Sequence, residues 1–153
     1  MTRSQIVMLV EDRSDDVELA CLALEKCKVA KEIVTVRDGQ EALDYLFGTG
    51  DHAGREATRL PEIVLLDLKL PRVDGLEVLR RMRADARTRR IPVVVLTSSN
   101  EERDVCASYE LGANSFVRKP VDFSQFAEAM RQLGQYWLVL NQPAAAGPEV
   151  RSR

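Results

Sequence analysis

The 153-residue chain is poor in the residues that build thiolate metal sites, disulfide frameworks and membrane spans. It has one histidine and three cysteines, and the spacing of Cys21, Cys27 and Cys106 is typical of neither a zinc nor a redox site. Its apolar runs are far shorter than the roughly 20 residues that cross a bilayer, and its first residues show no secretory signal. A net charge of −2 gives no global attraction for nucleic acid or an anionic membrane. We therefore expect a cytoplasmic protein with buried, reduced thiols and with no nucleic-acid or membrane partner.

Short apolar runs alternate with amphipathic stretches along the chain. The runs predict strands at 6–10, 33–36, 63–67, 93–97 and 115–119. Helical spacing follows each run, which predicts five helices, the first at 16–27 and the last from Phe123. Strands that are joined through helices run parallel, with helices on both faces. The sequence therefore predicts an α/β fold, a doubly wound five-stranded parallel sheet flanked by five helices.

Polar residues stand where each predicted helix begins. Asp38, Asp74 and Asp122 each precede a Glu or Gln by three residues, a pattern that is typical of helix N-termini. Ser14 with Asp15, and Ser99 with Glu102, predict the caps of the first and fourth helices.

Five chemically competent residues stand at the ends of four of the predicted strands: Glu11, Asp12, Asp67, Thr97 and Lys119. In a doubly wound sheet, ligands bind outside the carboxyl ends of the strands. Carboxylates gathered there repel one another unless a cation lies among them. Oxygen ligands favour Mg²⁺ over zinc. Asp67 could then act as a nucleophile toward a phosphoryl group, with the metal, Lys119 and Thr97 neutralising charge.

Two other interpretations of Asp67 are possible. As a helix cap it is poorly placed, because "LKLP" follows and Asp74 is the better cap. As the nucleophile of a Mg²⁺-dependent phosphatase of the haloacid dehalogenase-like type, it would need a second aspartate two residues later as the general acid. That position is Lys69, which argues against turnover of small phosphate esters.

Four segments resemble the receiver domain of bacterial two-component response regulators. They are "LVED" (9–12), "LLDLKLPRVDG" (65–75), "VVVLTSS" (93–99) and "ANSFVRKP" (113–120). The resemblance spans residues 5–133 and implies a flavodoxin-like receiver fold. The loop at 48–60 and the segment "QLGQYWLVLNQP" look like the stand-alone receivers that are paired with phytochrome-type histidine kinases.

The resemblance also implies roles for the strand-end residues. Asp67 would accept the phosphoryl group from a sensor histidine kinase. Mg²⁺ would be held by Glu11, Asp12, Asp67 and the backbone carbonyl of Lys69. Lys119 would pair with the phosphoryl group, Thr97 would move toward it, and Phe116 would be the aromatic switch. The chain would then signal through protein contact. It would not be an enzyme, and its only reaction after phosphorylation would be slow self-dephosphorylation.

The last predicted helix is longer than a receiver needs. Apolar residues continue with helical spacing through Trp137 and Leu140, beyond the expected end of the fold. A large apolar patch left in water marks a contact surface, so we expect a homodimer through this helix. The alternative is that the segment folds back over the domain's own edge. We expect a receiver domain at 1–140 and a flexible tail at 141–153.

The segment "RRMRADARTRR" holds six arginines between positions 80 and 90. No aromatic residues interleave with them, and the rest of the chain is acidic. A solvated helix face is favoured over a nucleic-acid patch.

Overall fold

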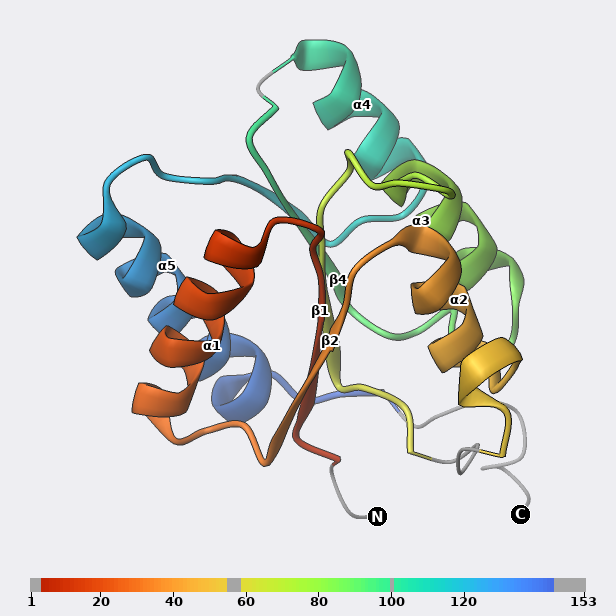
Figure 1. Cartoon of the computed structure of the whole chain (residues 1–153), viewed down its shortest axis with the longest axis horizontal. Helices are drawn as coiled ribbons and strands as arrows, with labels where there is room; N and C mark the ends of the chain where they lie inside the picture. Colours follow the sequence, from red (N-terminus) through yellow and green to blue (C-terminus); the bar gives the residue numbers. More distant parts are fainter. Residues whose placement is uncertain (1–3, 55–58, 100, 145–153) are drawn as a thin grey trace.

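A five-stranded parallel sheet forms the centre of the molecule in the computed structural model, which describes residues 4–54, 59–99 and 101–144 (Figure 1). The strand order is β2-β1-β3-β4-β5, and every neighbouring pair is parallel. The strands are β1 (Ile6–Val10), β2 (Glu32–Val36), β3 (Ile63–Leu66), β4 (Val93–Thr97) and β5 (Ser115–Arg118). The predicted fold class is therefore confirmed, with strand ends within one residue of the prediction.

Helices cover both faces of the sheet (Figure 1). On one face, α1 (Ser14–Cys27) and α5 (Phe123–Gln135) pack side by side. On the other face lie α2 (Gly39–Phe47), α3 (Gly75–Ala84) and α4 (Glu102–Glu110). Each face encloses its own apolar cluster, centred on Leu66 and Met82 on one side and on Leu65 and Met130 on the other.

The central strands are apolar throughout because both of their faces are covered. Every residue of β1, β3 and β4 is buried, whereas the edge strands β2 and β5 are only partly covered. Continuous burial of this kind is what a parallel sheet between two helix layers requires.

Three of the five predicted helix caps are confirmed. The side chains of Asp38, Asp74 and Asp122 accept backbone hydrogen bonds at the starts of α2, α3 and α5. The other two predictions are wrong. The N-cap positions of α1 and α4 are Arg13 and Glu101, and neither side chain makes a capping hydrogen bond.

The two polar pairs that were predicted as caps lie at other positions in the structure. Ser14 and Asp15 lie inside the first turn of α1. Ser99 donates its hydroxyl hydrogen bond to Asp104, inside α4, at 2.5 Å, while Glu102 is the first residue of that helix.

The C-terminal helical segment continues beyond α5, as the spacing predicted. Its last turn, Tyr136–Leu140, has π-helical hydrogen bonding, which is rare in proteins. Leu138 is buried in the cluster between α1, α5 and the sheet, and Trp137 packs partly against it. Tyr136, Val139 and Leu140 stay exposed. The segment thus folds back through two of its side chains and leaves three in solvent.

Two expectations about buried side chains are corrected. Phe123 begins the helical apolar spacing of the last helix, which predicts core packing, but as the first residue of α5 it is 57% exposed. Cys106 was expected to be a buried thiol, but it is exposed on α4.

Arg83 differs from the other arginines between positions 80 and 90, which were expected to form a solvated helix face. Its guanidinium donates hydrogen bonds to the carbonyls of Gly112, Arg89 and Ile91 and to the side chain of Asn114, at 2.8–3.1 Å. It therefore ties the end of α3 to the starts of β4 and β5. Burial lowers the pKa of this guanidinium.

None of the helices within the described ranges combines the length and the apolar character that a membrane span needs.

Candidate functional site

The site lies at the carboxyl edge of the sheet, where four neighbouring strands end. Glu11 and Asp67 directly follow β1 and β3, Thr97 ends β4, and Lys119 directly follows β5. Backbone bonds continue the ladder past the strands, since the N–H groups of Asp67 and Lys119 donate to the carbonyls of Val10 and Thr97 at 3.1 and 2.8 Å. Because β1 lies between β2 and β3, the strand order reverses here, and such a switch point is where ligands bind in open α/β sheets.

Lys119 is the centre of the site. Its Nζ lies 2.5 Å from Oε1 of Glu11, 2.8 Å from Oδ2 of Asp16 and 3.4 Å from Oδ2 of Asp67. The side chains of Glu11, Asp67 and Lys119 are 2%, 7% and 6% exposed. Buried charges of this kind persist only when they are paired and hydrogen-bonded. One ammonium group therefore holds together residues from three strands and α1.

Glu11, Asp12 and Asp67 form a second group, which shares Glu11 and Asp67 with the group around Lys119. Each offers a carboxylate oxygen, and these oxygens all lie within 4.8 Å of one another. Asp12 lies at the solvent side of this trio, and Glu11 and Asp67 are buried. An all-oxygen donor set with an open side suits a hard divalent cation that keeps some of its water. The predicted metal-ligating carboxylates are therefore close enough together to fit such an ion.

The electrostatics of the site indicate a shortage of positive charge. Burial raises the pKa of Glu11, and the hydrogen bond from Lys119 opposes this while the charge of Asp67 adds to it. Burial alone would lower the pKa of Lys119, but its bonds to Asp16 and Glu11 and the charge of Asp67 outweigh burial and raise it. Lys119 is therefore a charged ammonium that contacts three carboxylates, with Asp12 as a fourth beside them, and one positive charge does not neutralise them. A divalent cation would supply the missing charge.

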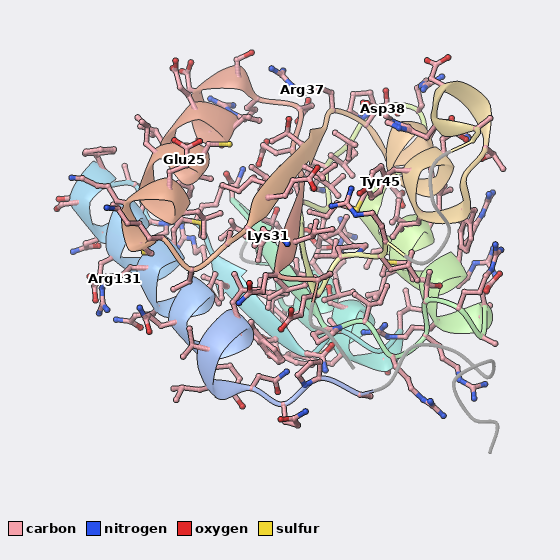
Figure 2. All side chains as sticks on the ribbon, turned by 90° about the horizontal axis from the view of Figure 1, so that it is seen from below. Glu25, Lys31, Arg37, Asp38, Tyr45 and Arg131 are labelled. Carbon is pink, nitrogen blue, oxygen red and sulfur yellow. The ribbon has the colours of Figure 1, made fainter. Side chains whose placement is uncertain are left out.

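The loop that follows Asp67 is tied down on its outer side. The backbone N–H of Lys69 lies 3.4 Å from Oδ1 of Asp67. Further along, Arg72 pairs with Asp38 at 3.1 Å, and the N–H of Gly39 donates to the carbonyl of Pro71 at 3.4 Å. Figure 2 shows Asp38 at the turn between β2 and α2. The start of α2 thus braces the loop that carries Lys69.

Thr97 and Phe116 stand at the margin of the carboxylate cluster. Thr97 is fully buried, and its hydroxyl accepts a hydrogen bond from the backbone N–H of Ser99 at 3.3 Å. Phe116 is partly buried on β5, opposite Val95 and three residues before Lys119. Thr97 lies on β4, the strand next to β3 and Asp67, and Phe116 lies one strand further out, on β5.

Asp16 was missed by the sequence analysis. It lies in the first turn of α1, and strand ends alone do not point to it. The available signal was its position five residues after Glu11, because a helix that starts at Ser14 brings its first turn back over the end of β1.

Comparison with known proteins agrees with this geometry. The model of the response regulator receiver domain family matches residues 7–131. Response regulator Rcp1 of Synechocystis sp. is 36% identical over 142 residues, which cover 92% of this chain and 95% of Rcp1.

Two solved structures extend the comparison. The phosphorylated cyanobacterial phytochrome response regulator RcpA superposes with a TM-score of 0.85 at 38% identity, covering 92% of this chain and 98% of that one. The bacteriophytochrome response regulator AtBRR is 55% identical, with a TM-score of 0.70, and the match covers 90% and 97% of the two chains.

A Mn²⁺-bound form of Rcp1 is also among the similar structures, with a TM-score of 0.85 at 34% identity, and the match covers 92% of this chain and 99% of that one. A protein with this fold therefore binds a divalent metal ion, and the spacing of Glu11, Asp12 and Asp67 in this chain suits such an ion. The sequence match over most of the chain, the shared fold and the carboxylate site agree: the protein is a two-component signalling protein that belongs to the response regulator receiver domain family.

Proposed function

We propose that Asp67 is the phosphoacceptor, and that the chain passes the resulting signal on through protein contact. The observation that carries this proposal is the convergence of Glu11, Asp67 and Lys119 from three separate strands into one buried group. An Asp67 oxygen would attack the phosphorus of a phosphohistidine, forming an acyl phosphate. The phosphorus–nitrogen bond would break, and its electron pair would return to the histidine ring, which takes up a proton.

The metal in this proposal is Mg²⁺. Glu11, Asp12, Asp67 and the backbone carbonyl of Lys69 would hold it, and it would neutralise the oxygens of the transferred group. The close spacing of the three carboxylates and the raised pKa of Glu11 support this choice of ligands. The brace between Asp38 and Arg72 supports a fixed position for the Lys69 backbone.

Lys119, Thr97 and Phe116 would respond to the phosphoryl group. Lys119 is close enough to Asp67 to donate to a phosphoryl oxygen after a small movement. Thr97 would turn its hydroxyl toward the same group, and Phe116 would change its packing beside it. The added negative charge would favour one of two arrangements of β4, α4 and β5, which is a population shift.

The donor in this proposal is a sensor histidine kinase of the phytochrome type. Support comes from RcpA and AtBRR, which are described as phytochrome and bacteriophytochrome response regulators. A cytoplasmic location is part of the same proposal. We also propose that the chain has no turnover beyond slow self-dephosphorylation. Lys69, at the place where a phosphatase would need its acid, supports this view over the haloacid dehalogenase-like alternative.

A homodimer through the C-terminal helical segment remains a prediction. The exposed side chains there are Tyr136, Val139 and Leu140, with Leu140 73% exposed. Trp137 packs partly on its own domain, so it would contribute only its outer edge. Light scattering over a dilution series should show a dimer that dissociates, and a strict monomer at micromolar concentration would refute it.

Intact-mass spectrometry tests the phosphoacceptor directly. Wild-type protein given Mg²⁺ and a small acyl-phosphate donor should gain the mass of one phosphoryl group. Asp67→Asn should gain none, and Asp74→Asn, which changes an exposed helix cap, is the matched control that should still react. A folded wild-type sample that never gains this mass, or an Asp67→Asn variant that does, would overturn the proposal. Omitting Mg²⁺ should abolish the reaction.

A further inference from the structure

Asp16 is a carboxylate in the site to which neither metal binding nor phosphoryl transfer has so far given a role. Its Oδ2 lies 2.8 Å from Nζ of Lys119, a normal length for a charge-assisted hydrogen bond. The contact between Lys119 and Asp67 is longer, at 3.4 Å. The ammonium group is therefore held toward Glu11 and α1, and away from the proposed phosphoacceptor.

The donors of Lys119 are all taken up by described residues. An ammonium group has three N–H donors, and within the described ranges its acceptors are Glu11, Asp16 and Asp67. A phosphoryl group on Asp67 would need a short bond from this ammonium group, and so Lys119 would have to move toward it. That movement lengthens at least one of its two shorter bonds.

Asp16 is the partner that can be released at lower cost. Its side chain is 23% exposed, so water can replace the ammonium group, whereas the side chain of Glu11 is 2% exposed and cannot be rehydrated. Asp16 also has a second cation beside it. The same Oδ2 lies 3.6 Å from Nε of Arg13, whose side chain is 67% exposed.

We infer that Asp16 is a positioning residue that holds Lys119 in its resting place and exchanges it for Arg13 and water when the phosphoryl group arrives. This inference rests on the proposed function of Asp67. Asp16 competes with the phosphoryl group for Lys119, so it weakens binding of the activated state. Arg13 stabilises the released carboxylate, so it strengthens that binding.

Beryllofluoride, a phosphoryl mimic, measures this competition. Its affinity can be followed by ¹⁹F nuclear magnetic resonance at saturating Mg²⁺. Asp16→Asn should bind the mimic about 5-fold more tightly, because the mimic then no longer competes with a charge-assisted hydrogen bond, and the partial exposure of Asp16 keeps the effect modest. Arg13→Gln should bind it about 2-fold more weakly, and in the Asp16→Asn background the Arg13→Gln change should have no effect.

Asp15→Asn is the matched control. Asp15 is exposed in the same helical turn, and its loss removes the same charge without touching Lys119. Its affinity should stay within about 2-fold of wild type, which separates a specific contact from general electrostatics. Equal gains in Asp15→Asn and Asp16→Asn would overturn the inference, as would weaker binding by Asp16→Asn.

A crystal structure of the Mg²⁺–beryllofluoride complex gives a second, independent test. The distance between Asp16 Oδ2 and Lys119 Nζ should exceed 3.5 Å there, and a retained short bond would overturn the inference. Asp67→Asn shows whether the mimic binds at the proposed place at all. If the wild type does not bind the mimic, the proposed function of Asp67 fails and this inference fails with it. If the wild type binds but Asp16→Asn shows no gain, only the role of Asp16 fails.

Discussion

Leu138 offers a sharp test of how the C-terminal helical segment is anchored. Its side chain is 1% exposed and packs in the cluster between α1, α5 and the sheet. Replacing such a leucine by alanine removes its transfer free energy and leaves a cavity, at a cost of roughly 2–5 kcal/mol. Because Leu138 lies in the last helical turn, where neighbours can partly relax, we expect Leu138→Ala to lower the free energy of unfolding by about 3 kcal/mol.

Urea denaturation followed by circular dichroism measures this change. The midpoint should fall with an unchanged slope, and the melting temperature should fall by roughly 6–12 °C for a chain of this size. Leu140→Ala is the matched control, because Leu140 is 73% exposed only two residues away. Leu140→Ala should change the free energy of unfolding by less than about 0.5 kcal/mol.

Equal costs for the two variants would refute the reasoning, as would a loss below about 1 kcal/mol for Leu138→Ala. Both should be measured at two protein concentrations. If a dimer covers Leu140, the cost of Leu140→Ala will depend on concentration, whereas the cost of a contact inside one domain will not.

Three further predictions concern the contact between the start of α2 and the loop after Asp67, the hydrogen bonds of Arg83, and the dependence of stability on acidic pH. Gly39→Ala should weaken Mn²⁺ affinity in a fluorescence or calorimetric titration, because a Cβ there would lie 1.7 Å from the carbonyl oxygen of Val73 and push the loop after Asp67 outward. Arg83→Gln should lower the free energy of unfolding, measured by urea denaturation, by about 2 kcal/mol, because it removes hydrogen bonds to the partly buried carbonyls of Gly112 and Ile91. Glu77→Gln should flatten the loss of stability on acidification, measured by urea midpoints. The pKa of Glu77 is lowered to about 2 in the folded chain by its arginine partners, so its contribution is present above the usual carboxyl pKa and is lost as the pH falls toward about 2.

Much of the fold is predictable because the apolar runs and polar cap residues of the sequence agree with the burial and hydrogen bonding of the same residues in the structure. The run "IVLL" reads as a central strand, and the structure buries every one of its residues between two helix layers. Aspartate caps are equally readable, since Asp74 and Asp122 each satisfy backbone donors through their own side chains. The starts of α1 and α4 are not readable in this way, because Arg13 and Glu101 provide no side-chain cap.

The site is predictable as far as strand ends determine it. Parallel strands bring their carboxyl ends to one edge, so the sequence alone is enough to group Glu11, Asp67 and Lys119. The same rule cannot indicate which partner Lys119 prefers. The preferred partner depends on the path of the chain from β1 into α1, because this path places Asp16 beside Lys119. In the sequence, Asp16 is only one of the acidic residues in a first helical turn.

The hydroxyl oxygen of Thr97 already accepts a hydrogen bond in the structure, and this bears on how the proposed signal would leave the site. It accepts from the N–H of Ser99 at 3.3 Å, and the hydroxyl of Ser99 in turn donates to Asp104 in α4 at 2.5 Å. The hydrogen of this hydroxyl is still free to donate, so only a displacement of the Thr97 oxygen toward a phosphoryl group on Asp67 would lengthen the contact with Ser99 and weaken the connection to the start of α4. A fully buried donor left without a partner costs about 1–3 kcal/mol, and the partly buried N–H of Ser99 would lose less than that, within the range of coupling free energies of allosteric proteins. Added charge at Asp67 would therefore bias α4 through these two hydrogen bonds, one from Ser99 to Thr97 and one from Ser99 to Asp104.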